Sequence, residues 1–205
     1  MSASEQSVLV AESQISSGSD GCWSEAVSKG EIRCLQTVGE QLFSGSTNVR
    51  VWDLRTGLNT HSIPMKPRTS VKDMVLQQQE GRTSVWCAHS DGRVSEIVVD
   101  PGSFEPELDR QFSAHRSAVS TILVTPELEI WTGSSRGTIR CWSIEEIASA
   151  PPVRTTKLGC PFYEPMVAVE LEWQGSRGSD VRCLLSVPSE GTVWSGSSGK
   201  GGTHV

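Results

Sequence analysis

Tryptophan recurs at a regular interval in this chain, and that interval constrains the fold more than any other feature. Trp86 and Trp131 each open a short segment that runs into a glycine turn, and 131 − 86 = 45 residues separate them. A repeat of about 40–45 residues is typical of β-propeller blades, each a four-stranded antiparallel sheet. Such sheets bury both faces only when they stack on one another, so the sequence predicts an all-β protein.

Four segments align on this repeat. Phe43, Trp131 and Trp194 each precede a Ser/Thr-Gly-Ser triplet, and Trp86 opens a more divergent copy. An almost continuously apolar run precedes each copy and predicts an inner strand covered on both faces. In three copies an alternating run follows a tight turn, where Gly92 and Gly137 supply the positive φ that the turn requires. The apolar runs are 32–38, 71–76, 119–125 and 181–187, and the alternating runs are 49–54, 93–99 and 138–144.

The repeat divides the chain into about three and a half blades, so we predict a partial propeller. The interval from Trp131 to Trp194 is 63 residues, 18 more than the repeat, which predicts an insertion near 145–180. Within it, 166–173 alternates and predicts an outer strand. We assign residues 1–27 to an N-terminal segment, within which 21–27 is a candidate outer strand. The blades are predicted at 28–66, 67–113, 114–160 and 166–198. Residues 199–205 are predicted to be a flexible Gly-rich tail.

Residues 42–53 resemble a WD repeat, with Trp52-Asp53 as the dipeptide that names the family. Residues 130–143 resemble a second copy with Ser143 at the Asp position, and Ala114-His115 resembles the Gly-His pair that opens a repeat. The resemblance implies a hydrogen-bond network from that His through a Ser or Thr to a turn Asp and a strand Trp, incomplete in each blade here. It assigns structural roles in the repeat to Trp52, Asp53, Asp91, His115, Trp131, Trp142 and Trp194.

The resemblance implies a scaffold that binds other proteins and does not itself catalyse a reaction. Because rim and face loops carry binding in such folds, we select five candidate partner-binding residues at the hairpin turns. Trp23 and Trp173 lie outside the repeat pattern and are alternative candidates as exposed anchors. The five turn residues are Asn48, Asp91, Arg93, Arg136 and Arg140.

A second class of function stays open. The Trp-led segments also resemble the propellers found ahead of inositol-polyphosphate 5-phosphatase domains, which implies a regulatory propeller cut from a larger signalling enzyme. The end of the pattern soon after Trp194 motivates this alternative. An incomplete ring further predicts pairing with another propeller half or self-association, and a decayed repeat protein with aggregating sheet edges is a third alternative.

Composition excludes several other classes. The net charge of −6 and the scattered Lys and Arg disfavour nucleic-acid binding. No pair among the six cysteines forms a C-x-x-C motif, and 196–201 lacks the spacing of a phosphate-binding loop. Three of the four histidines have no acidic or Cys neighbour at ligand spacing, and Asp91 near His89 is explained by the hairpin turn. We therefore predict no catalytic residue, cofactor or metal. Without a leader or a long apolar run, we expect a cytoplasmic chain with no membrane span and with buried, free thiols.

Overall fold

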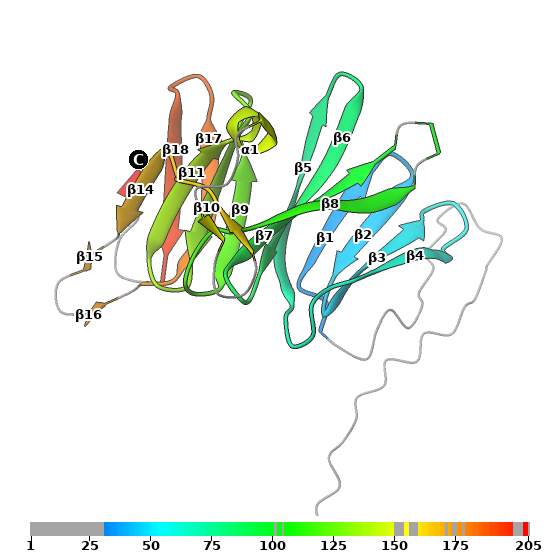
Figure 1. The fold of residues 1–205 in the computed structure, drawn as a ribbon, viewed down its shortest axis with the longest axis horizontal. Helices are drawn as coiled ribbons and strands as arrows, with labels where there is room; N and C mark the ends of the chain where they lie inside the picture. The colour runs from blue at the N-terminus through cyan, green and yellow to red at the C-terminus, as the bar shows by residue number, and fades with distance from the viewer. Residues whose placement is uncertain are drawn as a thin grey trace, which may run out of the picture.

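The structure, a computed structural model, contains four main antiparallel sheets that follow one another along the chain (Figure 1). Three sheets have four strands and the last has three, so the predicted all-β fold of about three and a half blades is confirmed. The described residues are 31–100, 102–103, 105–149, 154–155, 160–170, 172–173, 176–177, 179–198 and 203–204. The predicted N-terminal strand at 21–27 lies outside them.

Each sheet runs from an inner to an outer strand in chain order. The first sheet has β1 (Cys34–Val38), β2 (Gln41–Gly45), β3 (Asn48–Asp53) and β4 (Asn59–Pro64). The second has β5 (Val71–Gln79), β6 (Arg82–His89), β7 (Arg93–Val99) and β8 (Pro106–Ser113). The third has β9 (Val119–Val124), β10 (Glu129–Ser134), β11 (Thr138–Ser143) and β14 (Val167–Glu170), and the fourth has β17 (Val181–Val187), β18 (Thr192–Ser197) and β19 (Thr203–His204).

The four apolar runs form the inner strands β1, β5, β9 and β17, as predicted. Strand β5 lies between β1 and β9, and β17 lies on the other side of β9, so the sheets fan out from a shared inner row (Figure 1). The glycine turns behave as the sequence predicts, because Gly92 and Gly137 have φ of 87° and 77°. The sheets therefore stack as blades, with turns at both ends of each sheet.

A separate hydrophobic cluster fills each of the three junctions between neighbouring sheets. Phe43 packs with Val85 between the first and second sheets, and Trp86 packs with Ile130 between the second and third. Trp131 packs with Val193 between the third and fourth. The aromatic residue at the repeated position on the second strand thus always points toward the following sheet.

Small residues on the second strand let each junction close. Val71, Val119 and Val181 open the inner strands and are fully buried. A Cβ added to Gly133 would lie 2.7 Å from Val181 Cβ, and one added to Gly45 would lie 3.0 Å from Val71 Cγ1. Real Cβ atoms rarely or never approach so closely, so the first and third junctions require glycine where the valine of the next sheet enters. At the second junction Ala88 occupies the equivalent position and packs in the same cluster as Val119.

A half-buried carboxylate links the second and third sheets. Asp73 accepts hydrogen bonds from Thr121 Oγ1 at 3.1 Å and from the Ile122 amide at 3.0 Å. Burial nevertheless raises the pKa of this carboxyl group. Ser120 Oγ donates to Asp180 at 2.6 Å and adds a polar link from the third sheet to the start of the fourth.

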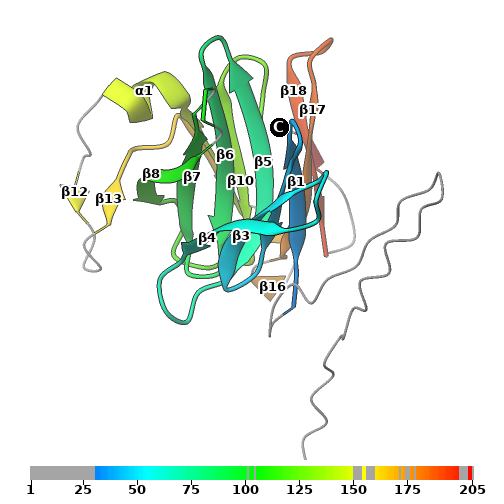
Figure 2. The same cartoon turned by 90° about the vertical axis from the view of Figure 1, so that its right-hand side faces the viewer.

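The insertion after β11 packs on the outer side of the second and third sheets (Figure 2). Tyr163 stacks edge-on against Phe112, with ring centroids 5.8 Å apart, and its carbonyl accepts the Trp142 indole N–H at 3.2 Å. The alternation at 166–173 yields β14, the outer strand of the third sheet, as predicted. The remaining elements are α1 (Ile144–Ser149), β12 (Arg154–Thr155), β13 (Pro161–Phe162), β15 (Glu172–Trp173) and β16 (Ser176–Arg177), and the sequence did not predict α1.

One prediction at the C-terminal end needs correction. In the tail predicted to be flexible, residues 203–204 form β19, which pairs with β18 through Ser195 and Trp194, and the rest of that tail lies outside the described residues. Trp194, assigned to the blade core, is 46% exposed because no further sheet covers that face within the described residues. The other four tryptophans of the core prediction, Trp52, Trp86, Trp131 and Trp142, are buried.

Candidate functional site

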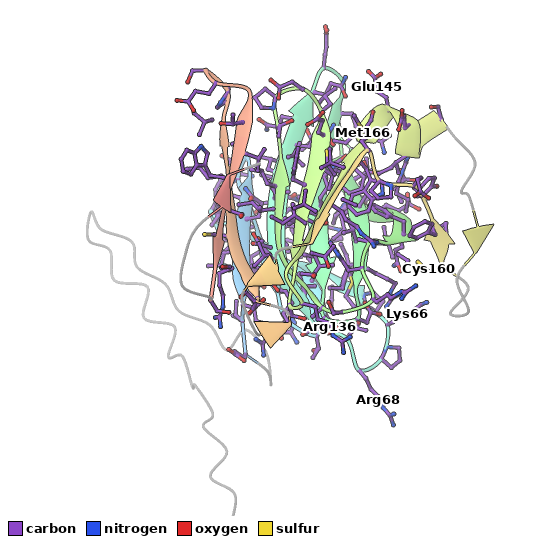
Figure 3. The ribbon with its side chains drawn as sticks, turned by 90° about the vertical axis from the view of Figure 1, so that its left-hand side faces the viewer. Lys66, Arg68, Arg136, Glu145, Cys160 and Met166 are labelled. Atoms are coloured by element: carbon purple, nitrogen blue, oxygen red, sulfur yellow. The ribbon has the colours of Figure 1, made fainter. Side chains whose placement is uncertain are left out.

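The connections between strands gather at two ends of the stacked sheets, and the charges of these ends differ. One end holds the β2–β3, β6–β7 and β10–β11 turns and the loops β4–β5 and β8–β9, and we call it the basic end. Every exposed ionisable side chain in these five connections is a cation. Figure 3 shows three of them on the same end, away from Glu145. The exposed cations are Lys66, Arg68, Arg116 and Arg136.

The β4–β5 loop displays Arg68 through a strained turn. The Thr69 amide donates to the Lys66 carbonyl at 3.2 Å, and the Thr69 hydroxyl donates to the same oxygen at 2.6 Å. Arg68 occupies the third position of this turn with φ of 64°, where glycine is usual. A non-glycine residue there costs about 1 kcal/mol, and such strain gathers at functional sites.

The β6–β7 turn supports the loop that carries Arg116. The amides of Ala114 and His115 both donate to the Gly92 carbonyl, at 3.0 and 2.9 Å. A Cβ on Gly92 would lie 2.8 Å from the Ser117 carbonyl oxygen, so the loop rests directly on this turn. The β6–β7 turn therefore fixes the position of the β8–β9 loop.

The one carboxylate of these connections, Asp91, is compensated within the protein. Arg93 Nε donates to Asp91 Oδ2 at 2.6 Å, and Arg93 Nη1 donates to Gln111 Oε1 at 3.0 Å. Arg93 is 4% exposed, so this pair is part of the support and does not face solvent. The exposed charge of these five connections is therefore positive, and at the same end an exposed carboxylate before β1, Glu31, is paired with Arg33.

A buried histidine anchors the same loop from below. His115 Nε2 lies 2.7 Å from Thr132 Oγ1, and Arg140 Nη1 donates to the Ala114 carbonyl at 2.7 Å. Burial, with the nearby Arg140 charge, lowers the pKa of His115 to about 3. His89 is similar, since it lies 2.7 Å from Ser95 Oγ and burial lowers its pKa to about 4. Both imidazoles are neutral at physiological pH.

The opposite end is acidic. It holds the turns 39–40, 54–58, 80–81, 125–128 and 188–191, the β7–β8 connection and α1, and its one exposed cation among the described residues is Arg55. Its exposed carboxylates are Glu40, Glu80, Asp100, Glu105, Glu127, Glu145, Glu146 and Glu190. The exposed cations and carboxylates of these connections therefore lie at opposite ends of the strands, a separation that the net charge of −6 does not reveal.

A buried carboxylate of the second sheet belongs to its internal support. Glu96 is 2% exposed and accepts from Ser84 Oγ at 2.7 Å, Arg82 Nη2 at 2.9 Å and Arg110 Nε at 2.8 Å. Both arginines also contact Asp109. These hydrogen bonds satisfy the Glu96 carboxylate inside the sheet, so we assign it a structural role and not a catalytic one.

Comparison with known families agrees with this arrangement. The sequence matches the model of the family described as the IP5P C-F beta-propeller over residues 25–200, 176 of the 205 residues. The chain belongs to this β-propeller family. The family describes a propeller linked to inositol polyphosphate 5-phosphatases and not a catalytic domain. A comparison with curated proteins finds no match.

Within the IP5P C-F propeller, the residues predicted for the repeat network form separate pairs of hydrogen-bonded groups and not one continuous network. His115 bonds Thr132, but the Trp142 indole donates to the Tyr163 carbonyl and not to Thr132, because the insertion brings that carbonyl to the strand. In the first sheet, the Trp52 indole donates to Ser44 Oγ at 2.9 Å. Asp53 Oδ1 accepts the amides of Arg55 and Thr56 at 2.7 and 3.2 Å and so closes the β3–β4 turn.

The five predicted partner-binding residues do not form one exposed group. Only Arg136 among them is exposed, Arg93 is buried, and Asn48, Asp91 and Arg140 are half-buried. Trp23 lies outside the described residues, and so does the side chain of Trp173. The sequence reasoning missed three exposed cations because it considered hairpin turns and not the loops that lead into each inner strand. They are Lys66, Arg68 and Arg116.

The thiols are more varied than predicted. The five described cysteines are free, but Cys34 is half-buried and Cys183 is exposed, which corrects the expectation of uniform burial. Burial raises the pKa of the Cys160 thiol, although the positive charges of Arg93 and Lys66 lower it. Figure 3 shows Cys160 and Lys66 on the same side of the sheets. Among the described residues, no group of three or more His, Cys, Asp or Glu is placed to hold a metal ion. The described helix is too short to cross a membrane.

Proposed function

We propose that this IP5P C-F propeller is a WD-repeat-type scaffold that binds acidic segments of other proteins through its basic end. The observation that carries the proposal is that all exposed ionisable side chains of the five connections there are cations. Charges of one sign on one face attract and orient a partner of the opposite sign. The carboxylates of the acidic end repel such a partner and so favour one orientation.

A charge-reversal experiment tests this proposal. The probe is a fluorescein-labelled peptide of Glu, Asp and Ser, and anisotropy reports its binding to the full chain. Replacing Arg68, Arg116 and Arg136 together by Glu should weaken binding by at least about tenfold, since like charges then face the peptide. Arg55→Glu at the acidic end is the control and should leave binding unchanged, because Arg55 is exposed and distant from the basic end.

Two results would count against the basic end as the binding surface. One is equal binding of the parent chain and the triple variant. The other is binding that does not weaken between 50 and 300 mM salt (concentrations on the order of those at which ionic screening is strong), since exposed charge pairs are screened by salt. Cytoplasmic location is part of the proposal, and the free thiols support it. Fractionation of cells that express the tagged chain checks the location.

We also propose a second function, in which the propeller is the regulatory domain of a larger inositol-polyphosphate 5-phosphatase. The family match is the observation that favours it. The test is to read the transcript through the codon for Val205. A phosphatase-coding sequence downstream supports this function, whereas a stop codon at that point argues against it.

A further inference from the structure

Left-handed backbone positions belong to glycine in the described part of the chain, with two exceptions. Six glycines and two other residues have positive φ, and only glycine adopts this conformation without steric cost. The exceptions are Arg68, with φ of 64°, and Leu128, with φ of 61°. Leu128 is half-buried, so its side chain contributes packing that offsets the strain, whereas Arg68 is exposed and contributes little. Packing therefore gives no reason for a side chain at position 68.

The turn that contains Arg68 has the features of a type II turn, in which the third residue is usually glycine. Pro67 occupies the second position, where its fixed φ suits such a turn. The amide and the hydroxyl of Thr69 both donate to the Lys66 carbonyl oxygen, at 3.2 and 2.6 Å. Two hydrogen bonds to one oxygen hold the turn closed, so Arg68 keeps a conformation that an unrestrained arginine would leave.

Both ends of the β4–β5 loop are fixed to the sheets. Met65 is buried and packs in the cluster between the first and second sheets. The Ser70 amide donates to Ser90 Oγ at 2.9 Å, and the Ser70 carbonyl accepts the Ser90 amide at 2.9 Å. Within 65–70, only residues 66–68 are exposed. The loop is thus a rigid support for a short exposed segment that carries two cations.

The Arg68 guanidinium has no partner among the described residues, unlike most arginines of the chain. Five other arginines each form an ion pair with a carboxylate, namely Arg33, Arg55, Arg82, Arg110 and Arg182. Arg68 forms no hydrogen bond or ion pair within the described part of the chain. Figure 3 shows its side chain beyond Lys66, directed away from the sheets. Its N–H donors are therefore available, and their planar fork matches the two oxygens of a carboxylate.

We infer that Arg68 is the specificity-determining residue of the basic end, and that its guanidinium binds a Glu or Asp carboxylate of the acidic partner through two parallel hydrogen bonds. This inference rests on the proposed function and names the residue on which the affinity chiefly depends. Backbone strain that the fold does not require is retained where it serves binding. A rigid loop also loses little freedom when it binds. Arg136 lacks this strain, because Gly137 takes the left-handed position of its turn.

Asparagine at position 68 tests the inference, because asparagine tolerates a left-handed conformation and carries no charge. In the anisotropy assay with the acidic peptide and the full chain, Arg68→Asn should raise the dissociation constant at least about fivefold. Arg136→Asn should raise it at most about twofold, as for one exposed charge. Arg68→Asn should also raise the midpoint of urea unfolding by about 0.3 M, because the strain is relieved. Arg55→Asn, which removes an exposed cation from the acidic end, is the matched control and should leave binding unchanged.

A second variant separates charge from geometry. Arg68→Lys keeps the charge and the strain but not the planar fork, so it should weaken binding about threefold and leave the urea midpoint unchanged. Weaker binding together with higher stability, as expected for Arg68→Asn, is a result that loss of folding cannot produce. Parent-like binding by Arg68→Asn, or equal losses from Arg68→Asn and Arg136→Asn, would overturn this inference. If the triple Glu variant still bound weakly in either case, the proposed function would stand, whereas a parent chain that does not bind the peptide would overturn both.

Discussion

Alanine at Gly92 should destabilise the protein far more than alanine at Gly81. Both glycines have positive φ, 87° and 73°, so alanine pays a similar backbone strain of about 1–2 kcal/mol at either position. A Cβ at Gly81 has no atom within 4 Å, whereas one at Gly92 would lie 2.8 Å from the Ser117 carbonyl oxygen and closer still to that of His115. Overpacking of this kind adds about 1–3 kcal/mol.

The neighbouring hydrogen bonds increase the difference. Shifting the loop away from a new Cβ stretches the bonds that Ala114 and His115 donate to the Gly92 carbonyl, each of which contributes about 1 kcal/mol. We therefore expect a loss of about 3–5 kcal/mol for Gly92→Ala and about 1–2 kcal/mol for Gly81→Ala. Urea unfolding followed by tryptophan fluorescence, at one protein concentration, measures both. Equal losses would refute the view that the β6–β7 turn supports the β8–β9 loop.

Three further predictions concern buried polar groups. The unfolded chain protonates His115 near its ordinary pKa of 6.5 and the folded chain only near 3, so His115 should make stability fall by about 1.4 kcal/mol per unit as pH drops through this window. His115→Gln should roughly halve the fall in urea-derived stability between about pH 7 and 5, because His89, whose folded-state pKa is about 4, contributes the rest; an unchanged slope would contradict the assignment. Glu96→Ala should lower the free energy of unfolding by about 3 kcal/mol in urea, because two arginines and Ser84 lose their shared acceptor. A loss below about 0.5 kcal/mol would show that Glu96 contributes no more than an exposed ion pair does. Trp52→Phe should lower the free energy of unfolding by about 1–2 kcal/mol, because Ser44 loses its hydrogen-bond donor. Adding Ser44→Ala to this variant should then change the stability little, whereas additive losses would show that the two side chains act independently.

The repeat in the sequence was sufficient to predict the stacking of sheets. Trp131 and Trp86 mark the same position on β10 and β6, and both point into the junction with the following sheet, as a 45-residue repeat requires. The glycine turns were predictable for the same reason, since Gly92 and Gly137 occupy equivalent places. Features that every blade shares leave a periodic trace in the sequence.

Features that belong to one blade leave no such trace. The Tyr163 carbonyl takes the Trp142 indole N–H only because the insertion folds back on the outer rim, and no spacing in the sequence predicts that contact. Burial of Arg93 likewise depends on Gln111 from the neighbouring strand. The sequence analysis selected only Arg136 of the four cations at the basic end, because these cations are far apart in the chain and come together only when the connections of separate sheets gather at one end.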